Sequence, residues 1–286
     1  MRDFRTRVGL TFLSGAMLLG VAAHAQEQPR RGEPASAAPF PGKKTDWMGY
    51  DRYDFVVDGQ PVLVVTPKQA APGKPWIWRA EFFGHRPEVD VALLGKGFHL
   101  VYMNVGNTFG CPDAMAHWDV LYDLLTKKHG LAKKAALEGL SRGGLYCFNW
   151  AAAHPDRVAC IYADAPVCDF KSWPGGKGKG KGSAGDWKKL LDDYHFASEA
   201  EALAYTKNPV DNLRPLAEAK VPLLHVYGDA DDVVPYDENT AIIKKRYEAL
   251  GGPIEVIVKK GVGHHPHGLD DPSPIIAFVL KHATAQ

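Results

Sequence analysis

The segment 135–150, AALEGLSRGGLYCFNW, constrains the fold of this chain more than any other stretch. It begins like the end of a buried strand, turns sharply at the G-x-S-x-G pattern of residues 139–143, and continues as a helix. In such a turn the serine, here Ser141, takes a strained backbone conformation that lifts its hydroxyl clear of the sheet. We expect a side chain at Gly139 or Gly143 to collide with the neighbouring helix or strand. The pattern alone arises by chance in roughly one chain in ten of this composition, so its context decides its meaning.

The N-terminus has the features of an export signal. Three arginines precede an almost wholly apolar run at residues 8–23, and Ala23-His24-Ala25 fits the small-x-small rule for cleavage after Ala25. We therefore predict that residues 1–25 are a signal peptide and that the protein is secreted or periplasmic, with no stable membrane insertion after cleavage. An uncleaved anchor is the alternative, but the run is shorter than the ~20 residues that a membrane span needs.

Composition excludes some classes of partner. Cleavage leaves 31 basic against 32 acidic side chains, a net charge of about −1, so no overall field attracts nucleic acid or an anionic membrane. Residues 26–45 are rich in Pro, Ala and charge without periodicity, which predicts a disordered leader. Residues 46–286 are long enough for one catalytic domain.

The chain contains four cysteines, Cys111, Cys147, Cys160 and Cys168. They are too few for a disulfide scaffold in a chain of this length, although export would permit disulfides. Cys147 and Cys160 lie in apolar helix and strand contexts, which favours buried free thiols. The sequence assigns no pairing.

Strands and helices alternate along the rest of the chain. The expected strands are a hairpin at 53–67 and strands at 75–85, 99–103, before Ser141, 158–163, 222–227 and 254–259; the expected helices are 87–94, 112–128, 143–153, 238–250 and 274–282. This alternation predicts an α/β protein whose mostly parallel sheet has helices on both faces. Ligands of such sheets collect at the carboxyl ends of the strands.

One insertion interrupts the alternation. Residues 170–213 place a Gly/Lys loop and two short amphipathic helices before the strand at Pro222, where they would cover the strand ends like a lid. Trp173 and Trp187 flank the loop and could stack on sugar rings or simply pack. The lysines at 177, 179 and 181 either form a solvated loop or attract an acidic polymer.

Two further turns follow apolar strands and carry carboxylates and imidazoles. GDADDVVP at 228–235 offers Asp229, Asp231 and Asp232, and GVGHHPH at 261–267 offers His264, His265 and His267. A serine hydroxyl is a poor nucleophile at neutral pH and needs a base beside it, with a third group that fixes the tautomer of the base. The two turns can supply both.

With GLSRGG, GDADDVVP and GVGH in this order, the chain from about Tyr53 to its end resembles the α/β-hydrolase superfamily, in its secreted bacterial esterase and prolyl-oligopeptidase-like group. The resemblance implies the α/β-hydrolase fold and no cofactor. It also implies that Ser141 is the nucleophile, Asp231 the acid and His264 the general base.

Acyl transfer also requires hydrogen-bond donors for the developing oxyanion. The backbone N–H of Arg142 should be one, and the loop that begins at Glu81 should provide the other from Phe82 or Phe83. The guanidinium of Arg142 would lie within reach of the acyl oxygen or of a nearby carboxylate, or form a structural ion pair with Glu81 or Glu138.

The three histidines of residues 264–267 also raise a metal interpretation. Three imidazoles on one turn rarely converge on a single ion, and no H-E-x-x-H motif or cysteine cluster accompanies them. We therefore expect no metal site, with His265 and His267 shaping the pocket wall.

These features predict a serine hydrolase that cleaves a small-molecule or polysaccharide carboxylic ester through an acyl-enzyme on Ser141. The stretch around Arg142 is similar to G-C-S-R-x-G-K of glucuronoyl esterases, but Leu140 and Leu145 replace the Cys and Lys, so this likeness covers only a few residues and does not fix a substrate. A carbohydrate ester, either an O-acetyl or a uronate ester, is the favoured substrate class. A serine peptidase of the prolyl-oligopeptidase-like type is an alternative. Those enzymes carry a large propeller domain, and roughly 50 residues ahead of the first expected strand are too few for one. A non-catalytic binding protein on a hydrolase scaffold is the other alternative.

Overall fold

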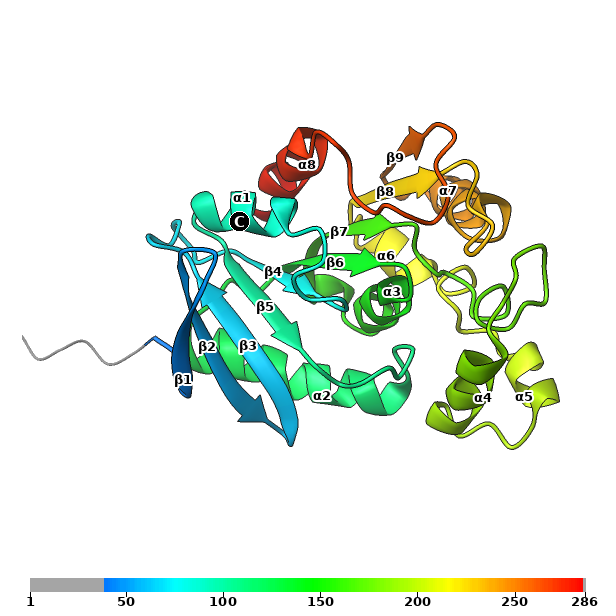
Figure 1. Ribbon diagram of the computed structural model, residues 1–286, viewed down its shortest axis with the longest axis horizontal. Helices are drawn as coiled ribbons and strands as arrows, with labels where there is room; N and C mark the ends of the chain where they lie inside the picture. Colours follow the sequence, from blue (N-terminus) through cyan, green and yellow to red (C-terminus); the bar gives the residue numbers. More distant parts are fainter. Residues whose placement is uncertain (1–38, 285–286) are drawn as a thin grey trace, which may run out of the picture. The chain divides into compact units, whose positions relative to one another are not determined.

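A computed structural model describes residues 39–284 of the chain (Figure 1). The strands are β1 (Lys43–Trp47), β2 (Tyr50–Val57), β3 (Gln60–Thr66), β4 (Trp76–Arg79), β5 (His99–Met103), β6 (Ala135–Leu140), β7 (Val158–Asp164), β8 (Leu223–Gly228) and β9 (Ile254–Lys259). The helices are α1 (Glu88–Gly95), α2 (Pro112–Asp123), α3 (Gly143–Ala153), α4 (Ala184–Asp193), α5 (Glu199–Ala204), α6 (Arg214–Glu218), α7 (Thr240–Ala249) and α8 (Ser273–Ala283). A π-helical turn, Leu124–Lys128, extends α2.

The strands form one sheet in the order β1-β2-β3-β5-β4-β6-β7-β8-β9. The pairs from β5 through β4, β6, β7 and β8 to β9 are all parallel, whereas β1, β2, β3 and β5 pair antiparallel. Strands β4, β6 and β7 are buried along their whole length, as parallel strands covered on both faces must be. The expected mostly parallel sheet is confirmed, and its strands end at one common edge.

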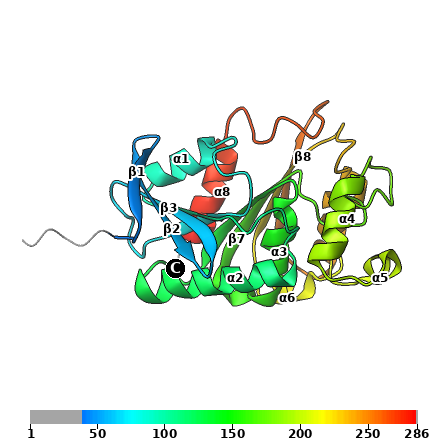
Figure 2. The ribbon, with the colours of Figure 1, turned by 60° about the horizontal axis from the view of Figure 1, so that its bottom comes forward.

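Helices cover both faces of this sheet. Helices α1 and α8 pack into one apolar cluster, and α2, α3, α6 and α7 share the cluster on the other face (Figure 2). Indole rings dominate the second cluster: Trp78 stacks on Trp118 with ring centroids 4.1 Å apart, and Trp150 meets Trp78 edge to face at 5.2 Å. These rings fix α2 and α3 against β4. Strand β4 pairs with β6, the strand that ends directly before Ser141.

The leader that we expected to end at residue 45 is ordered at its C-terminal end. Strand β1 begins at Lys43 and pairs with β2, and the Phe40 ring, 3% exposed, stacks on His129 with centroids 4.4 Å apart. Strand β1 could not be predicted from the sequence because it is an exposed edge strand, KKTDW, without alternating apolar residues. The expected signal peptide, residues 1–25, lies outside the described residues. Within residues 39–284 no helix has the length and apolar character needed to cross a membrane.

All four cysteines are buried and free of disulfides in the described part of the chain. The expectation of buried thiols at Cys147 and Cys160 is confirmed. Burial raises the pKa of both thiols, which keeps them protonated and unreactive.

The insertion 170–213 contains α4 and α5, side by side in Figure 1, after the Gly/Lys loop. Its loop packs on the turn that carries Asp231: Ser172 Oγ donates to Glu238 Oε2 at 2.6 Å, and the amide of Lys181 donates to the carbonyl of Asp232 at 3.3 Å. The three lysines of the loop pair with Glu199, Asp237 and Asp232 respectively. Their charges are therefore matched within the chain.

Candidate active site

Ser141 lies at the sharp bend between β6 and α3, with a backbone φ of 50°. Its amide donates to the carbonyl of Asp164 at 2.9 Å, and its own carbonyl accepts from the amide of Val167 at 2.9 Å. These bonds to the segment that follows β7 hold a conformation that a serine rarely adopts. The strained serine expected at residue 141 is present.

The glycines of the bend allow a close approach of backbone segments. A side chain at Gly139 would place its Cβ 2.7 Å from the carbonyl oxygen of Gly143, so the expected collision at Gly139 is confirmed. The expectation for Gly143 was wrong, because a Cβ there would meet nothing closer than 3.6 Å. The tight position is the next one, Gly144, where a Cβ would lie 2.7 Å from Pro166 and from the Val167 carbonyl. The close contact between α3 and the loop that follows β7 is therefore made by Gly144, one residue later than the G-x-S-x-G motif suggests.

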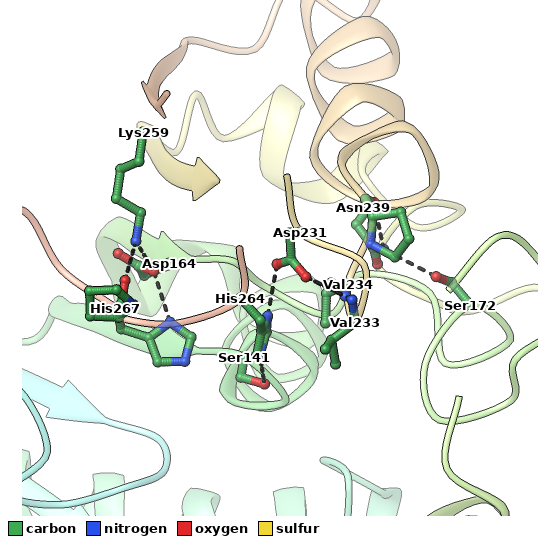
Figure 3. A network of polar contacts seen from close by, with 12 residues as sticks. Ser141, Asp164, Ser172, Asp231, Val233, Val234, Asn239, Lys259, His264 and His267 are labelled. Carbon is green, nitrogen blue, oxygen red and sulfur yellow. Dashed lines mark hydrogen bonds and ion pairs between the residues drawn. The ribbon is translucent and has the colours of Figure 1, made fainter. Parts of the chain in front are cut away.

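A continuous line of hydrogen bonds joins Asp231, His264 and Ser141 (Figure 3). Ser141 Oγ lies 2.9 Å from His264 Nε2, and His264 Nδ1 lies 2.8 Å from Asp231 Oδ2. The other oxygen of Asp231 accepts the amides of Val233 at 2.9 Å and Val234 at 2.8 Å. Because a carboxylate only accepts, His264 Nδ1 donates and Nε2 presents its lone pair to the serine hydroxyl. The arrangement can remove a proton from Ser141.

The alternatives that the sequence left open are placed elsewhere. Asp229 accepts the amide of Gly261 at 2.6 Å, and Asp232 pairs with Lys181 on the surface. His265 is exposed, whereas His267 is buried and binds a different carboxylate. Of the three aspartates and three histidines, the structure brings Asp231 and His264 to Ser141.

The loops that carry Asp231 and His264 touch at Gly228. A Cβ at Gly228 would overlap the carbonyl oxygens of Val262 and Gly263. The amide of Ala230 also donates to the Val262 carbonyl at 3.0 Å. Only glycine at the end of β8 therefore lets the two loops approach closely enough to join acid and base.

Asp164, at the end of β7, is a structural residue that sequence reasoning missed. Its carboxylate is fully buried, lies 2.9 Å from His267 Nδ1 and accepts the amide of Gly268 at 2.8 Å. Lys259 Nζ lies 3.5 Å from Asp164 and donates to the Pro266 carbonyl at 2.7 Å (Figure 3). Asp164 therefore anchors the far end of the histidine loop, as Asp231 anchors its middle. The signal in the sequence was an aspartate directly at the end of a wholly apolar strand.

Arg79, at the end of β4, is the second residue that the sequence analysis did not single out. Its side chain is fully buried and bonds to Asp90 at 2.5 Å and to Glu138 at 2.9 Å. It also donates to the carbonyls of Glu81 and Phe82, at 3.2 Å each, and to that of His85. One guanidinium thus fixes the backbone of the loop that we expected to supply an oxyanion donor.

In that loop Phe82 has a φ of 54°. Within residues 39–284, the amides of Phe82, Phe83 and Arg142 have no hydrogen-bond acceptor. Phe82 and Phe83 both line the same cavity as Ser141. The backbone N–H groups that we expected as oxyanion donors are therefore free of other acceptors. Both Phe82 and Phe83 are placed to be the second donor beside Arg142.

The side chain of Arg142 takes the structural role that was one of the two expected. Its guanidinium lies 3.3 Å from Glu81 Oε2 and 4.7 Å from the centroid of the Phe82 ring. Glu138, the other expected partner, binds Arg79 instead. Burial raises the pKa of the Glu81 carboxyl, and the charge of Arg142 opposes this rise.

The cavity at Ser141 has a volume of about 380 Å³. It is lined by Phe82, Phe83, His85, Ser141, His264, His265 and His267. No residue of 170–213 is among those lining residues, so its role as a lid stays a prediction. Trp173 packs instead against Phe109, with ring centroids 6.1 Å apart, and Trp187 is 9% exposed beside Phe170.

Two histidines of the cavity wall are shifted toward their neutral forms. Burial lowers the pKa of His85 and of His265, and the neighbouring His267 contributes in the same direction. Both of these imidazoles therefore favour their uncharged forms in the wall that faces Ser141.

Comparison with known proteins places this geometry in a family. Residues 94–284 match the model of the prolyl oligopeptidase family. A comparison with curated proteins finds no match.

Solved structures share the fold. An acylaminoacyl peptidase from Pyrococcus horikoshii superposes with a TM-score of 0.61 at 14% identity, over 82% of this chain and 41% of that one. A putative dipeptidyl aminopeptidase IV from Bacteroides ovatus gives 0.60 at 14% identity, over 82% and 35%. Est1E from Butyrivibrio proteoclasticus gives 0.57 at 17% identity, over 82% and 99%. The chain thus spans less than half the length of the two peptidases.

The family match covers most of the chain, and the mostly parallel sheet and the bend at Ser141 agree with it. The chain therefore belongs to the prolyl oligopeptidase family and has an α/β-hydrolase fold.

Proposed function

We propose that the protein is an exported serine esterase that hydrolyses carboxylic esters, with Ser141 as nucleophile, His264 as general base and Asp231 as the group that orients the base. The observation that carries the proposal is the line of hydrogen bonds from Asp231 Oδ2 through both nitrogens of His264 to Ser141 Oγ. Each member is positioned by a different strand end, so the three converge only in the folded protein.

The reaction follows from this geometry. His264 Nε2 takes the proton of Ser141 as Oγ attacks the ester carbonyl, and the imidazolium then gives that proton to the leaving alcohol. An acyl-enzyme remains on Ser141. Water, deprotonated by the same nitrogen, attacks the acyl carbon and releases the carboxylic acid and the serine hydroxyl. The free amides of Arg142 and of Phe82 or Phe83 would stabilise the negative oxygen of each tetrahedral intermediate.

The cavity lining supports an ester rather than a peptide with a free N-terminus. An exopeptidase that holds an α-ammonium group needs a carboxylate in its pocket. The side chains that line this cavity are phenylalanine, serine and histidine, and the nearby carboxylate of Glu81 is paired with Arg142. Phenyl and imidazole faces suit the apolar face of a sugar ring.

Among carbohydrate esters we place O-acetyl esters ahead of uronate esters. The charge of Arg142, which could have bound a uronate, is matched by Glu81, and the charges of Lys177, Lys179 and Lys181 are matched by Glu199, Asp237 and Asp232. A neutral acyl group therefore meets no unmatched charge in the cavity.

A substrate screen tests the proposal. Wild type and Ser141→Ala are assayed on 4-nitrophenyl acetate, acetylated and methyl-esterified polysaccharides, and proline-containing peptide 4-nitroanilides. We expect acetyl ester turnover that falls at least about 10⁴-fold in Ser141→Ala. Faster turnover of the anilides than of the esters would identify a peptidase. Absence of any turnover by a protein that unfolds cooperatively would favour the binding-protein alternative.

A further inference from the structure

Three histidines surround one point in the wall of the cavity. His85, His265 and His267 each offer a ring nitrogen, and these nitrogens lie within 4.8 Å of one another. His85 follows β4, whereas His265 and His267 follow β9, so the set is assembled from two loops that are distant in sequence. We infer that His85, His265 and His267 form a binding site for a zinc ion beside Ser141.

The buried member of the set is already prepared as a ligand. His267 is 2% exposed, and its Nδ1 lies 2.9 Å from Asp164 Oδ1. Since the carboxylate only accepts, Nδ1 carries the hydrogen and Nε2 keeps a free lone pair. Figure 3 shows the ring held by Asp164 at one nitrogen while the other nitrogen is turned away from that carboxylate. In zinc sites, the ring nitrogen of a ligand histidine that does not bind the metal commonly donates a hydrogen bond to a carboxylate.

The other two members can complete the coordination. Zinc binds imidazole nitrogen at about 2.0–2.1 Å, so tetrahedral ligands lie about 3.3 Å apart and the set must contract. His85 and His265 are exposed side chains at the rim of the cavity, and the required movement falls on them. The ring centroids are 4.8 Å apart for His265 and His267, 5.7 Å for His85 and His267, and 6.4 Å for His85 and His265, so the largest movement is the approach of His85 to His265.

The donor set selects the kind of cation. Three neutral imidazoles suit zinc and similar transition metals, whereas magnesium and calcium prefer oxygen ligands. Three histidines also leave a fourth position for water or another ligand. The sequence alone pointed away from a metal because His264, His265 and His267 lie on one turn. The structure directs His264 to Ser141 and supplies His85 from another loop in its place.

A bound ion would share the cavity with the substrate. The three histidines and Ser141 line the same space of about 380 Å³. Zinc should therefore compete with an ester and raise the apparent KM while kcat at saturating ester stays unchanged. This consequence rests on the proposed esterase function, whereas zinc binding itself does not.

Titration calorimetry of the purified protein with ZnCl2 tests the site directly. We expect one zinc ion per chain and no binding of MgCl2. His85→Ala and His265→Ala should each weaken zinc binding at least about tenfold. The matched control is His195→Ala, which removes an exposed histidine paired with Asp113, and it should bind zinc like the wild type.

Several results would overturn the inference. They are absence of saturable zinc binding by folded wild type, unchanged affinity in both His85→Ala and His265→Ala, or an equal loss in His195→Ala. Thermal unfolding of each variant without metal establishes that it is folded. Zinc that raises the apparent KM of wild type but not of His85→Ala supports the shared cavity, and zinc that binds without changing KM contradicts it. If no ester is turned over, calorimetry still decides whether the site exists.

Discussion

At the scale of single residues, the site depends on side chains whose positions are fixed by backbone groups. The strained φ of Ser141 costs roughly 1–3 kcal/mol, and the bonds of its amide and carbonyl to the β7 segment offset that cost. Asp231 is 8% exposed, and its Oδ1 accepts hydrogen bonds from two backbone amides. Its other carboxylate oxygen, Oδ2, is therefore available to His264 Nδ1. The tautomer of His264 is thus determined by the backbone around Asp231.

The first prediction concerns that tautomer. In Asp231→Asn the oxygen can still accept the amides of Val233 and Val234, but an NH2 group then faces His264 Nδ1. The histidine should adopt the form with hydrogen on Nε2, which cannot accept the proton of Ser141. We expect kcat for 4-nitrophenyl acetate to fall about 10³–10⁴-fold with little change in KM or in unfolding temperature.

Asp232→Asn provides the control for this change. Asp232 is exposed and paired with Lys181, so its substitution should alter kcat less than about twofold. Retention of more than a tenth of kcat by Asp231→Asn, or an equal loss in Asp232→Asn, would mean that Asp231 does not orient the base.

Residues of the site could be predicted where a local pattern places them. Ser141, Asp231 and His264 each stand in a turn that directly follows an apolar strand, so the shared sheet edge made their convergence predictable. Arg79 and Asp164 were not predictable in the same way. Each ends an apolar strand, but their partners, Glu138 and His267, lie far away in sequence, so the local pattern does not show with which group each is paired.

Among the strands and loops, the position of His264 relative to Asp231 depends on the contact between the turns that follow β8 and β9. These neighbouring strands are parallel, so their turns leave the sheet side by side. Gly228 allows one turn to lie directly on the other, and Asp229 accepts the amide of Gly261 at 2.6 Å across the same contact. The distance between acid and base is therefore set by loop packing.

The second prediction tests this packing. Gly228→Ala should push the histidine loop away from the acid loop, because its Cβ overlaps backbone oxygens that no rotamer change can relieve. We expect kcat/KM to fall at least about tenfold and the free energy of unfolding to fall by about 1–3 kcal/mol. Steady-state kinetics and urea unfolding measure the two effects.

The matched control is Gly263→Ala in the same contact. A Cβ at Gly263 would meet nothing closer than 3.7 Å, so this variant should keep activity and stability close to those of the wild type. Equal behaviour of the two alanine variants would show that the contact at Gly228 does not position His264.

The parallel strands could be predicted because a strand covered on both faces is a continuous apolar run, as β7 is. Strand β1 could not, because an exposed edge strand has no such run. The contacts of the insertion 170–213 could not be predicted either. Its loop is held on the acid turn by contacts of long sequence separation, such as Ser172 with Glu238, which no local pattern encodes.

At the scale of the whole molecule, the same sheet buries two histidines that serve no part of the site. His225 in β8 is fully buried and hydrogen bonded to Thr240 Oγ1 at 3.0 Å, and burial lowers its pKa to about 3. His99 in β5 is 6% exposed, and burial lowers its pKa to about 4. Burial therefore favours the neutral form of both imidazoles in the folded chain.

The third prediction concerns stability against pH. The unfolded chain protonates His225 below a pKa of about 6.5, whereas the folded chain resists protonation until about pH 3. The stabilisation is therefore complete above pH 6.5 and is lost as pH falls through this window. By pH 5 the loss from His225 should be about 2 kcal/mol.

Urea unfolding of wild type and His225→Gln at pH 7 and pH 5 measures that loss. The difference in stability between the two pH values should be about 2 kcal/mol smaller in the variant. His99→Asn should act in the same direction and provides a second test. Parallel pH profiles of wild type and both variants would exclude the buried histidines as the cause.

Covalent labelling tests whether Ser141 is a nucleophile that His264 activates. After reaction with a fluorophosphonate probe, peptide mass spectrometry should find the phosphonyl group on Ser141 of the wild type, much slower labelling in His264→Ala and none in Ser141→Ala. Labelling of another residue, or equal labelling of Ser141→Ala, would contradict the account.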